Sequence, residues 1–180
     1  MFKIINQHDC GVLEINIPNH KDDRGIFNKA YNYNSFIDLG INFIPREHFH
    51  SISDKNVLRG MHFQTKRSAH NKLINCVKGS ILDVCVDVRK GSKYYNQPVE
   101  ININEDSNIV LFIPKGFAHG FLSYEDNTIV QYMTDTVHDP INDRGILWNS
   151  IDFNWPIESP ILSDRDKTHT PLGYELCEFY

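Results

Sequence analysis

Short runs rich in valine and isoleucine recur along most of the chain, and they constrain the fold more than any other feature of the sequence. Turn-forming residues, such as Lys78-Gly79-Ser80 and Glu125-Asp126-Asn127, separate them. Short strands at this spacing are typical of an antiparallel sandwich or barrel, so the sequence predicts an all-β fold. The runs cover residues 12–17, 56–63, 72–77, 80–89, 99–103, 108–113 and 128–134.

The remaining segments predict little regular structure. Residues 33–39 predict one short helix that begins at Asn34-Ser35. Beyond Asp139-Pro140 the strand-like runs become rare and aromatic residues such as Trp148 and Trp155 appear, which indicates an irregular arm packed over the sheets. The chain has 180 residues and shows no internal repeat, so we predict a single domain over residues 1–180.

Charge and cysteine usage exclude several classes of protein. The formal net charge is −5, so the chain lacks the excess of basic residues typical of a nucleic-acid-binding protein. No run approaches the ~20 apolar residues of a membrane span, and the first ten residues contain no signal-peptide core. The cysteines are widely spaced and form no CxxC pair, so we expect free thiols in a reducing cytoplasm. They are Cys10, Cys76, Cys85 and Cys177.

The run at residues 80–89 alternates with the period of a strand. Leu82, Val84 and Val86 share one face, and Asp83 and Asp87 lie on the other. In one interpretation the apolar face packs on the core and the polar face meets solvent. In the other, the strand belongs to a barrel whose interior is partly polar because it holds a ligand. The sequence leaves both interpretations open.

The segment at residues 114–120 reads PKGFAHG and follows an apolar strand. Its PxGxxH form resembles the second motif of the cupins, which are jelly-roll barrels built as a double-stranded β-helix. Gly116 allows a tight turn, and the strand after it would direct His119 inward. The resemblance implies a cupin-type jelly-roll barrel with one or two short helices and an irregular C-terminal arm.

In many cupins the histidine of this motif binds a metal together with an HxH pair and a following glutamate. His48 and His50 have the HxH spacing and would point to one face of a strand. No glutamate follows within a few residues, so the ligand set is incomplete and exposed strand histidines are the simpler explanation. We therefore predict no metal and no cofactor. A metal-dependent cupin oxygenase or isomerase using His48, His50 and His119 is the alternative function.

The segment at residues 58–64 reads LRGMHFQ and brings a histidine close to basic residues. Arg59 lies three residues before His62, Lys72 opens the next strand, and Gly60 removes side-chain bulk where a ligand would approach. A histidine base near a lysine and an arginine suits proton abstraction from an anionic substrate. Taken alone, however, a strand histidine is more often structural.

Taken together, these segments resemble the dTDP-4-dehydrorhamnose 3,5-epimerase family, a cupin-fold group of nucleotide-sugar epimerases. The resemblance runs from about residue 12 to residue 170, in the family's order and at similar spacing. The RGxHFQ and IPxGFAHGF motifs are its most specific parts. The matching segments are residues 23–27, 57–64, 72–73, 83–89, 113–121, 131–132, 145–148 and 162–166.

The resemblance implies proton transfer at a nucleoside-diphosphate 4-keto sugar. The ketone acidifies the hydrogens on C3 and C5, so a base forms an enolate and an acid returns a proton to the opposite face. His62 matches the base, Asp166 the carboxylate that orients it, and Tyr132 the acid. Without the resemblance, Tyr132 would be read as a barrel-wall residue. Whether one or both centres invert stays open.

The resemblance also implies a set of substrate contacts. Lys72 and His119 match residues near the C4 oxygen, where enolate charge develops. Arg24 and Arg59 match groups on the diphosphate, whose oxygens suit a guanidinium fork. A solvated strand end for Lys72 and a turn arginine for Arg24 are the alternatives, and Asp83 is a second candidate support for His62 or Lys72. The implied substrate-binding set also includes Gln64, Asp143 and Arg165.

Four positions depart from the family pattern, and all four match contacts to the nucleotide base. Lys29 replaces a glutamate, Glu47 a glutamine, Phe49 an asparagine and His138 a tyrosine. We therefore predict a base other than thymine. Guanine is favoured, since Glu47 could accept hydrogen bonds from its N1–H and amino group. The expected substrate is thus a GDP-linked 4-keto sugar, such as a 6-deoxy-heptose of surface-polysaccharide synthesis, in preference to a dTDP-linked one.

Family members exchange N-terminal strands in homodimers, so the resemblance implies a homodimer in which Arg24 and Lys29 act on the partner's ligand. We expect no nucleic-acid and no membrane partner. A sugar-binding cupin without catalysis is a further alternative, against which the set of His62, Tyr132 and Asp166 argues.

Overall fold

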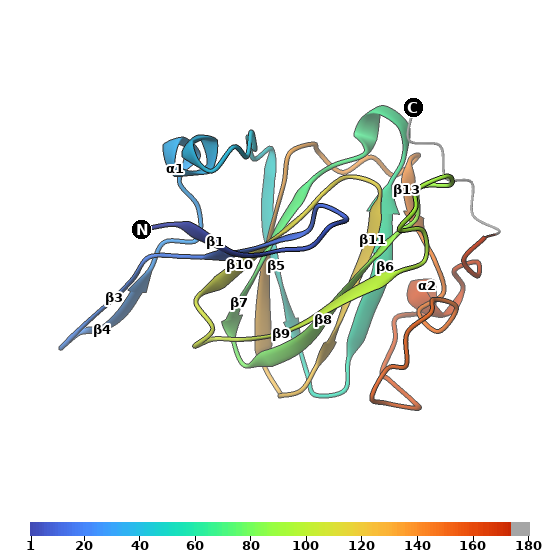
Figure 1. Cartoon of the computed structure of the whole chain (residues 1–180). Coiled ribbons are helices and arrows are strands. Elements are labelled where there is room, and N and C mark those ends of the chain that lie inside the picture. The colour runs from blue at the N-terminus through green and yellow to red at the C-terminus, as the bar shows by residue number, and fades with distance from the viewer. Residues whose placement is uncertain (174–180) are drawn as a thin grey trace.

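Antiparallel β-sheets make up most of the regular secondary structure, in a computed structural model that describes residues 1–173 (Figure 1). The larger sheet has the order β1 (Lys3–Gln7), β2 (Leu13–Asn16), β10 (Ile109–Ile113), β7 (Lys72–Lys78), β12 (Thr128–Thr134) and β5 (Glu47–Ser53). The second sheet has the order β13 (Asp143–Gly145), β6 (Leu58–Gln64), β11 (Phe117–Ser123), β8 (Ser80–Asp87) and β9 (Pro98–Asn104). A hairpin of β3 (Asn19–Asp22) and β4 (Gly25–Asn28) stands apart from both.

The helical elements are short. They are α1 (Tyr33–Asp38), a 3₁₀ turn (Lys66–Ser68) and α2 (Asp164–Lys167). The predicted all-β, cupin-type fold with one or two short helices is confirmed. Within residues 1–173 the two large sheets remain separate ladders, so the jelly roll is a sandwich whose sheets face each other.

A hydrophobic core fills the space between the two large sheets. Ile74 and Leu111 come from the larger sheet, and Ile81, Ile103 and Phe121 come from the second. All five are at most 1% exposed. Strand alternation explains this, because every second residue of each strand points to the same face.

Both faces of β8 are buried. Leu82, Val84 and Val86 pack under the C-terminal arm, while Asp83 and Asp87 are 0% exposed on the other face. The interpretation with a solvated polar face is therefore wrong. The polar-interior interpretation fits, because β8 contributes a buried carboxylate between the sheets.

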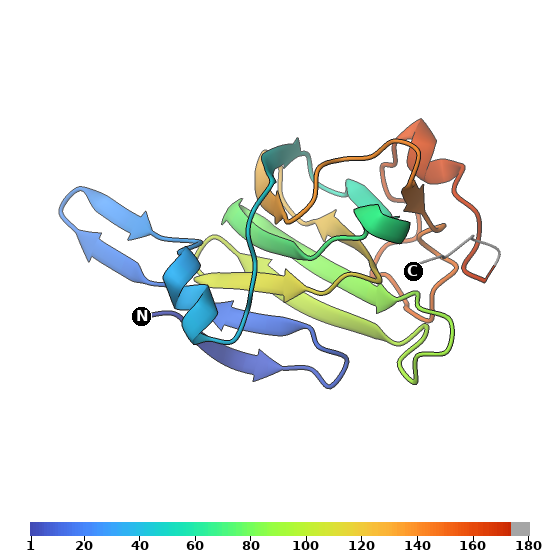
Figure 2. The ribbon, with the colours of Figure 1, turned by 90° about the horizontal axis from the view of Figure 1, so that it is seen from above.

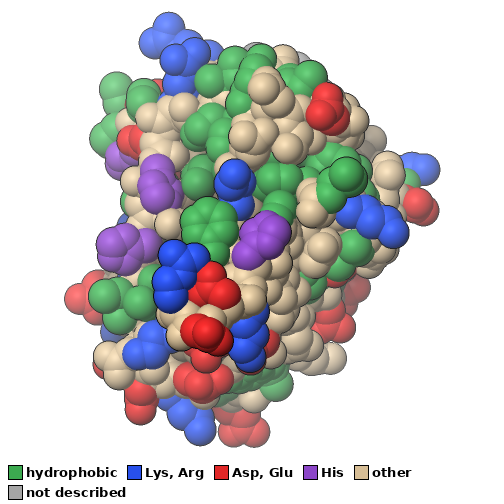
Figure 3. Space-filling model, turned by 90° about the vertical axis from the view of Figure 1, so that its left-hand side faces the viewer, with side chains coloured by type: hydrophobic (Ala, Val, Ile, Leu, Met, Phe, Trp, Pro, Cys, Tyr) green, Lys and Arg blue, Asp and Glu red, His purple; other side chains and the backbone are tan. Residues whose placement is uncertain are grey.

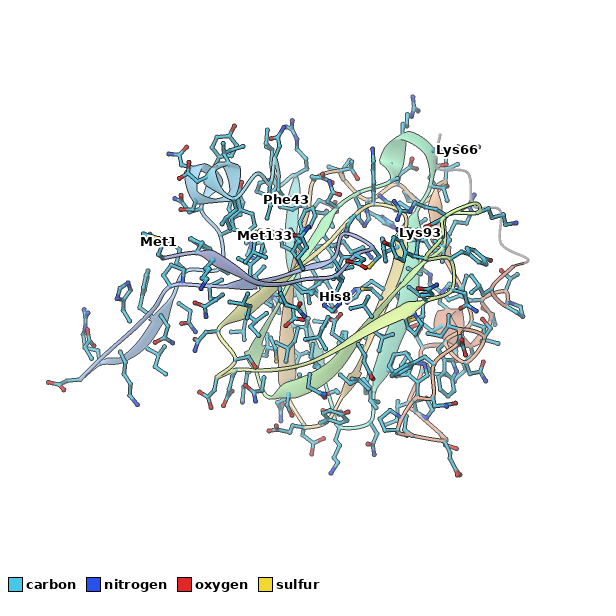
Figure 4. The ribbon with its side chains drawn as sticks, viewed as in Figure 1. Met1, His8, Phe43, Lys66, Lys93 and Met133 are labelled. Atoms are coloured by element: carbon cyan, nitrogen blue, oxygen red, sulfur yellow. The ribbon has the colours of Figure 1, made fainter. Side chains whose placement is uncertain are left out.

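Helix α1 covers the outer face of the larger sheet. Its N-cap is Asn32, whose side chain accepts a hydrogen bond from the Ser35 amide at 3.1 Å, so the helix begins before the expected Asn34-Ser35. Phe36 is fully buried beneath it in a cluster with Phe43, against which Met133 packs (Figure 4).

The expected irregular arm covers the outer face of the second sheet (Figure 2). Ile151 and Trp155 are buried against it, and the Trp155 indole donates to the Trp148 carbonyl at 2.9 Å. Further along the arm, parallel β-bridges join Ile161 to Val57 and Thr170 to Ile146. This path brings α2 to β6.

The β3–β4 hairpin projects from the sandwich, as Figures 1 and 2 show. All its residues are exposed, including Phe27 at 59%. On the face that bears the hairpin, hydrophobic side chains lie among charged ones of both signs (Figure 3).

Gly60 has a different role from the expected one. Its φ is +144°, and a Cβ there would lie 2.5 Å from the Cα of Gly120. The missing side chain therefore allows β6 and β11 to approach each other, rather than a ligand to approach β6.

Three of the four cysteines, Cys10, Cys76 and Cys85, are free thiols as expected, and Cys177 lies outside the described residues. Within residues 1–173, no helix has both the length and the apolar character needed to cross a membrane.

Candidate active site

A cavity of about 850 Å³ is lined by both large sheets and α2, a size suited to a small-molecule ligand. It collects every residue of the predicted site except Arg24 and Lys29. The collected residues are Glu47, Phe49, Arg59, His62, Gln64, Lys72, His119, Tyr132, His138, Asp143, Arg165 and Asp166.

Strand register brings the central residues together. His62 on β6 and His119 on β11 are direct cross-strand partners in the second sheet. Lys72 opens β7 and Tyr132 lies on the neighbouring β12 in the larger sheet. The cavity therefore receives imidazoles from one sheet, and an amine and a phenol from the sheet that faces it.

His62 is held by a carboxylate from the C-terminal arm. Its Nε2 lies 2.6 Å from Oδ1 of Asp166, and Asp166 Oδ2 accepts from the Gly60 amide at 3.3 Å. The Ser163 hydroxyl caps α2 by accepting from the Asp166 amide. Because a carboxylate only accepts, His62 carries its hydrogen on Nε2 and keeps a lone pair on Nδ1.

Burial and the neighbouring groups keep the imidazole neutral and the carboxyl ionised. Burial lowers the pKa of His62, and Lys72 and Arg165 lower it further against the opposing effect of Asp166. Burial alone would raise the pKa of the Asp166 carboxyl, but its contacts with the imidazoles of His169 and His62 hold it well below the usual range. His62 therefore has the state of a base at neutral pH.

Lys72 is a buried amine, not a solvated strand end. It is 9% exposed, and its Nζ donates to the His62 carbonyl at 2.9 Å. Burial lowers the pKa of Lys72 to about 8, although Asp143 and Asp83 favour the charged form. A desolvated cation here would interact strongly with a nearby anion.

Asp83 supports His119 rather than His62. Its Oδ2 lies 2.8 Å from His119 Nε2, and both side chains are buried. Asp83 Oδ1 has no hydrogen-bond partner among the described residues. His62 and His119 are thus held by different carboxylates, Asp166 and Asp83.

Tyr132 lies across the cavity from the second sheet. Its ring stacks on Phe49, with centroids 4.9 Å apart and planes 11° apart, and its hydroxyl lies 3.2 Å from Ser51 Oγ. Burial raises the pKa of the Tyr132 phenol well above its usual range. The phenol therefore stays protonated at neutral pH and has a proton to donate.

The cavity rim carries basic side chains held by neighbouring groups. Arg59 donates to the Ser53 hydroxyl at 2.9 Å and to the Ile52 carbonyl at 3.0 Å. Arg165 and His138 approach the same Asp143 oxygen, at 2.7 and 3.1 Å. The guanidinium groups of Arg59 and Arg165 line the same cavity, which suits it to an anion.

Gln64 lines the cavity, but its side-chain amide is hydrogen-bonded to protein groups instead of being free for a ligand. Its Oε1 accepts from the Asp139 amide at 2.6 Å, and its Nε2 lies 2.9 Å from the Ser68 carbonyl and 3.0 Å from Nδ1 of His70. Burial lowers the pKa of His70 to about 3. His70 lines the cavity, but no sequence motif indicates it.

Arg24 and Lys29 lie away from the cavity of their own chain. Arg24 stands at the turn of the β3–β4 hairpin, 89% exposed, and pairs with Asp22 at 2.6 Å. Lys29 directly follows the hairpin and is also exposed. Neither residue can contact a ligand in this cavity without a change of place or a second chain.

The alternative metal site is not assembled. In the described part of the chain, one group of three potential ligands has its donor atoms within 4.8 Å of one another, and it consists of His62, Asp166 and His169. His119 is committed to Asp83, and His48 and His50 are exposed on β5. His169 was not indicated by the sequence patterns, although it stands only three residues after Asp166.

Comparison with known proteins places the chain in a family. The family profile described as dTDP-4-dehydrorhamnose 3,5-epimerase matches residues 9–173. The dTDP-4-dehydrorhamnose 3,5-epimerase of Shigella flexneri is 39% identical over 150 residues, which cover 81% of this chain and 82% of the relative.

Solved structures of this family are similar to the chain over nearly its whole length. The Bacillus anthracis dTDP-4-dehydrorhamnose 3,5-epimerase with TDP and pyrophosphate bound has a TM-score of 0.92 at 35% identity, covering 96% of this chain and 100% of that one. The Legionella pneumophila dTDP-6-deoxy-D-glucose-3,5-epimerase in complex with dTDP-4-keto-L-rhamnose has a TM-score of 0.93 at 28% identity, covering 100% and 99%. The chain belongs to the dTDP-4-dehydrorhamnose 3,5-epimerase family of isomerases.

Proposed function

We propose that this protein epimerises a nucleoside-diphosphate 4-keto-6-deoxy sugar at C3 and C5, with a dTDP-linked sugar as its first substrate. The observation that carries the proposal is the placement of a carboxylate-bound neutral imidazole, His62, opposite a protonated phenol, Tyr132, in one cavity. Family membership and the dTDP-linked names of the relatives support the substrate class.

In the proposed reaction, His62 Nδ1 removes the hydrogen next to the ketone. The imidazolium that forms is stabilised by Asp166, 2.6 Å from Nε2. Positioned general bases of this kind contribute about 10²–10⁴-fold to rate. The Tyr132 hydroxyl then delivers a proton to the opposite face of the enolate, which inverts the centre.

The enolate oxygen needs a positive group or a hydrogen-bond donor. Lys72 supplies a buried cation, and His119, anchored by Asp83, supplies an imidazole close to Tyr132, with ring centroids 6.3 Å apart. A single such donor is worth roughly 3–4 kcal/mol in other enzymes. Arg59 and Arg165 at the rim suit the diphosphate.

A GDP-linked 4-keto sugar, such as a heptose of surface-polysaccharide synthesis, is the second candidate substrate. Glu47 lines the cavity together with Phe49 and His138, and its carboxylate is an acceptor that guanine can use but thymine can use less fully. The relatives reported above are named for dTDP-linked sugars, so the guanine prediction rests on Glu47 alone.

We further propose a cytoplasmic homodimer of single-domain chains. The β3–β4 hairpin carries Arg24, and its Phe27 side chain is 59% exposed. This exposure supports an exchange of hairpins in which each chain contributes residues to its partner's cavity.

Deuterium incorporation tests the proposed reaction. Incubation in D₂O with dTDP- and GDP-linked 4-keto-6-deoxy sugars, followed by mass spectrometry, should show a gain of two deuteriums on the true substrate. His62→Gln should lower the rate by about 10²–10⁴-fold, whereas His8→Gln, outside the cavity, should not change it. No gain with any sugar would contradict the proposed function, and a gain of one would reduce it to a single-centre epimerase.

A further inference from the structure

Asp166 has a second imidazole neighbour besides His62. His169 Nε2 lies 3.4 Å from Asp166 Oδ1, the same oxygen that His62 Nε2 approaches to 2.6 Å. The two imidazole rings meet edge to face, with centroids 5.5 Å apart. The His169 side chain is 12% exposed, and its Nε2 has no geometrically regular hydrogen bond within the described residues. Asp166 is therefore the polar group that this buried nitrogen faces.

The backbone holds His169 from both sides. The Thr168 amide donates to the Arg165 carbonyl at 3.1 Å, and the Leu147 amide donates to the Thr170 carbonyl at 2.9 Å. The first bond closes the end of α2, and the second ties the following residue to the segment after β13. His169 thus has a fixed place beside the carboxylate.

Gly145 makes the room for the His169 ring. A Cβ at Gly145 would collide with the ring, and the backbone of Gly145 carries no positive φ that would itself require glycine. Gly145 is also the cross-strand partner of His62 in the pairing of β13 with β6. The strand beside the base therefore lacks a side chain at the place where the second imidazole packs.

We propose that His169 is a positioning residue for His62 that acts through Asp166, an inference that rests on the proposed function. An imidazole N–H directed at Oδ1 uses the lone pair that His62 leaves free, and the ring blocks rotation of the carboxylate away from His62. The Asp166 carboxylate then already points at His62 Nε2 before His62 takes the proton from the substrate. Preorganisation matters because small misplacements of catalytic groups reduce rates strongly.

A divalent metal is a less suitable occupant of this cluster. His62, Asp166 and His169 do bring their donor atoms within 4.8 Å of one another. However, Lys72 and Arg165 are close enough to disfavour positive charge on His62, and they would disfavour a cation bound there in the same way. The surroundings therefore favour the positioning role.

The tautomer of His62 gives a test that needs no substrate. In ¹⁵N NMR of the full chain, His62 should carry its hydrogen on Nε2. His169→Phe keeps a ring but removes the donor, so the Nε2–H fraction should fall. His169→Gln keeps an N–H and should restore it. Thr168→Val removes a hydroxyl that bonds the Asp164 and Arg165 carbonyls but keeps the backbone bond that holds His169, so it should leave the fraction unchanged.

Kinetics complete the test. His169→Phe should lower kcat about tenfold with KM within twofold, and His169→Gln should recover most of the loss. Gly145→Ala should resemble His169→Phe, yet cost nothing further in a His169→Ala background. An unchanged His62 tautomer and kcat in His169→Phe would overturn the proposal. Failure of the proposed function would be visible separately, as an inactive wild type with the NMR result intact.

Discussion

Single residues of the cavity acquire distinct states from their immediate partners. His62 and His119 are cross-strand neighbours, yet one rests on Asp166 and the other on Asp83. Because each imidazole has its own carboxylate, the two rings can serve different tasks. Lys72 adds a buried cation to the same cavity, held by the His62 carbonyl.

The pH dependence of kcat/KM should follow His62 and Lys72. The base must be neutral, and since burial lowers the pKa of His62 below its usual 6.5, activity should persist to below pH 6.5 before it falls. Activity should also fall above pH 8, because the pKa of Lys72 is about 8 and the cation is lost there.

Lys72→Met isolates the alkaline limb of this profile. The variant should lose about 10²–10³-fold in kcat, the loss typical for one stabilising donor, and its residual activity should show no decline near pH 8. A pH profile of kcat/KM for both proteins, measured at substrate concentrations well below KM, checks this. Persistence of the decline in the variant would assign the limb to another group.

His70 should make the fold sensitive to acid. Burial lowers its pKa to about 3, whereas an unfolded histidine has a pKa near 6.5. Between these values the unfolded chain binds the extra proton, so the free energy of unfolding should fall by about 1.4 kcal/mol per pH unit as pH decreases below 6.5. Urea denaturation should show a shallower pH dependence for His70→Gln. Equal slopes in both proteins would show that His70 titrates normally.

The sequence predicted the centre of the site better than its surroundings. His62, Lys72 and His119 stand in motifs whose strand positions dictate where the side chains point. His70 and His169 were missed because one follows a 3₁₀ turn and the other lies in the arm, where direction depends on tertiary packing.

At the scale of elements, strands with strong alternation were predicted to within a few residues. β7, β8 and β12 match the valine- and isoleucine-rich runs closely. β5, whose sequence EHFHSIS is largely polar, was not predicted as a strand from such a run, because it is an edge strand that faces the cavity with one side. β3 and β4 are fully exposed and carry no burial pattern.

Helix α1 stabilises the fold without taking part in the site. Phe36→Ala should lower the free energy of unfolding by about 3–5 kcal/mol, because it empties a fully buried site. Tyr33→Ala on the exposed side should change it by at most about 0.5 kcal/mol. Denaturant titration measures both. Since α1 lines no part of the cavity, kcat per folded molecule should stay constant, and a parallel loss of kcat would contradict this separation.

At the scale of the whole molecule, the projecting hairpin is the feature that a lone chain does not explain. It projects from the sandwich (Figure 1) and carries Arg24, which is predicted for the diphosphate but is not among the residues that line the cavity. The proposed homodimer resolves this if Arg24 serves the partner's cavity.

Complementation between two inactive variants tests that arrangement. Arg24→Ala keeps His62 but lacks the donated arginine, and His62→Gln keeps the arginine but lacks the base. Co-expressed as a mixed dimer, they should form one intact site and recover activity well above either variant alone. Absence of recovery in a purified mixed dimer would place Arg24 on its own chain's ligand or on none.

The central claim is that His62 and Tyr132 act on opposite faces of the sugar. The most direct measurement is ¹H NMR of the Tyr132→Phe variant with a dTDP-linked 4-keto-6-deoxy sugar in D₂O. His62 should still exchange hydrogen for deuterium beside the ketone, while the inverted product should not form. Inversion at the wild-type rate, or loss of exchange and inversion in equal proportion, would contradict the account.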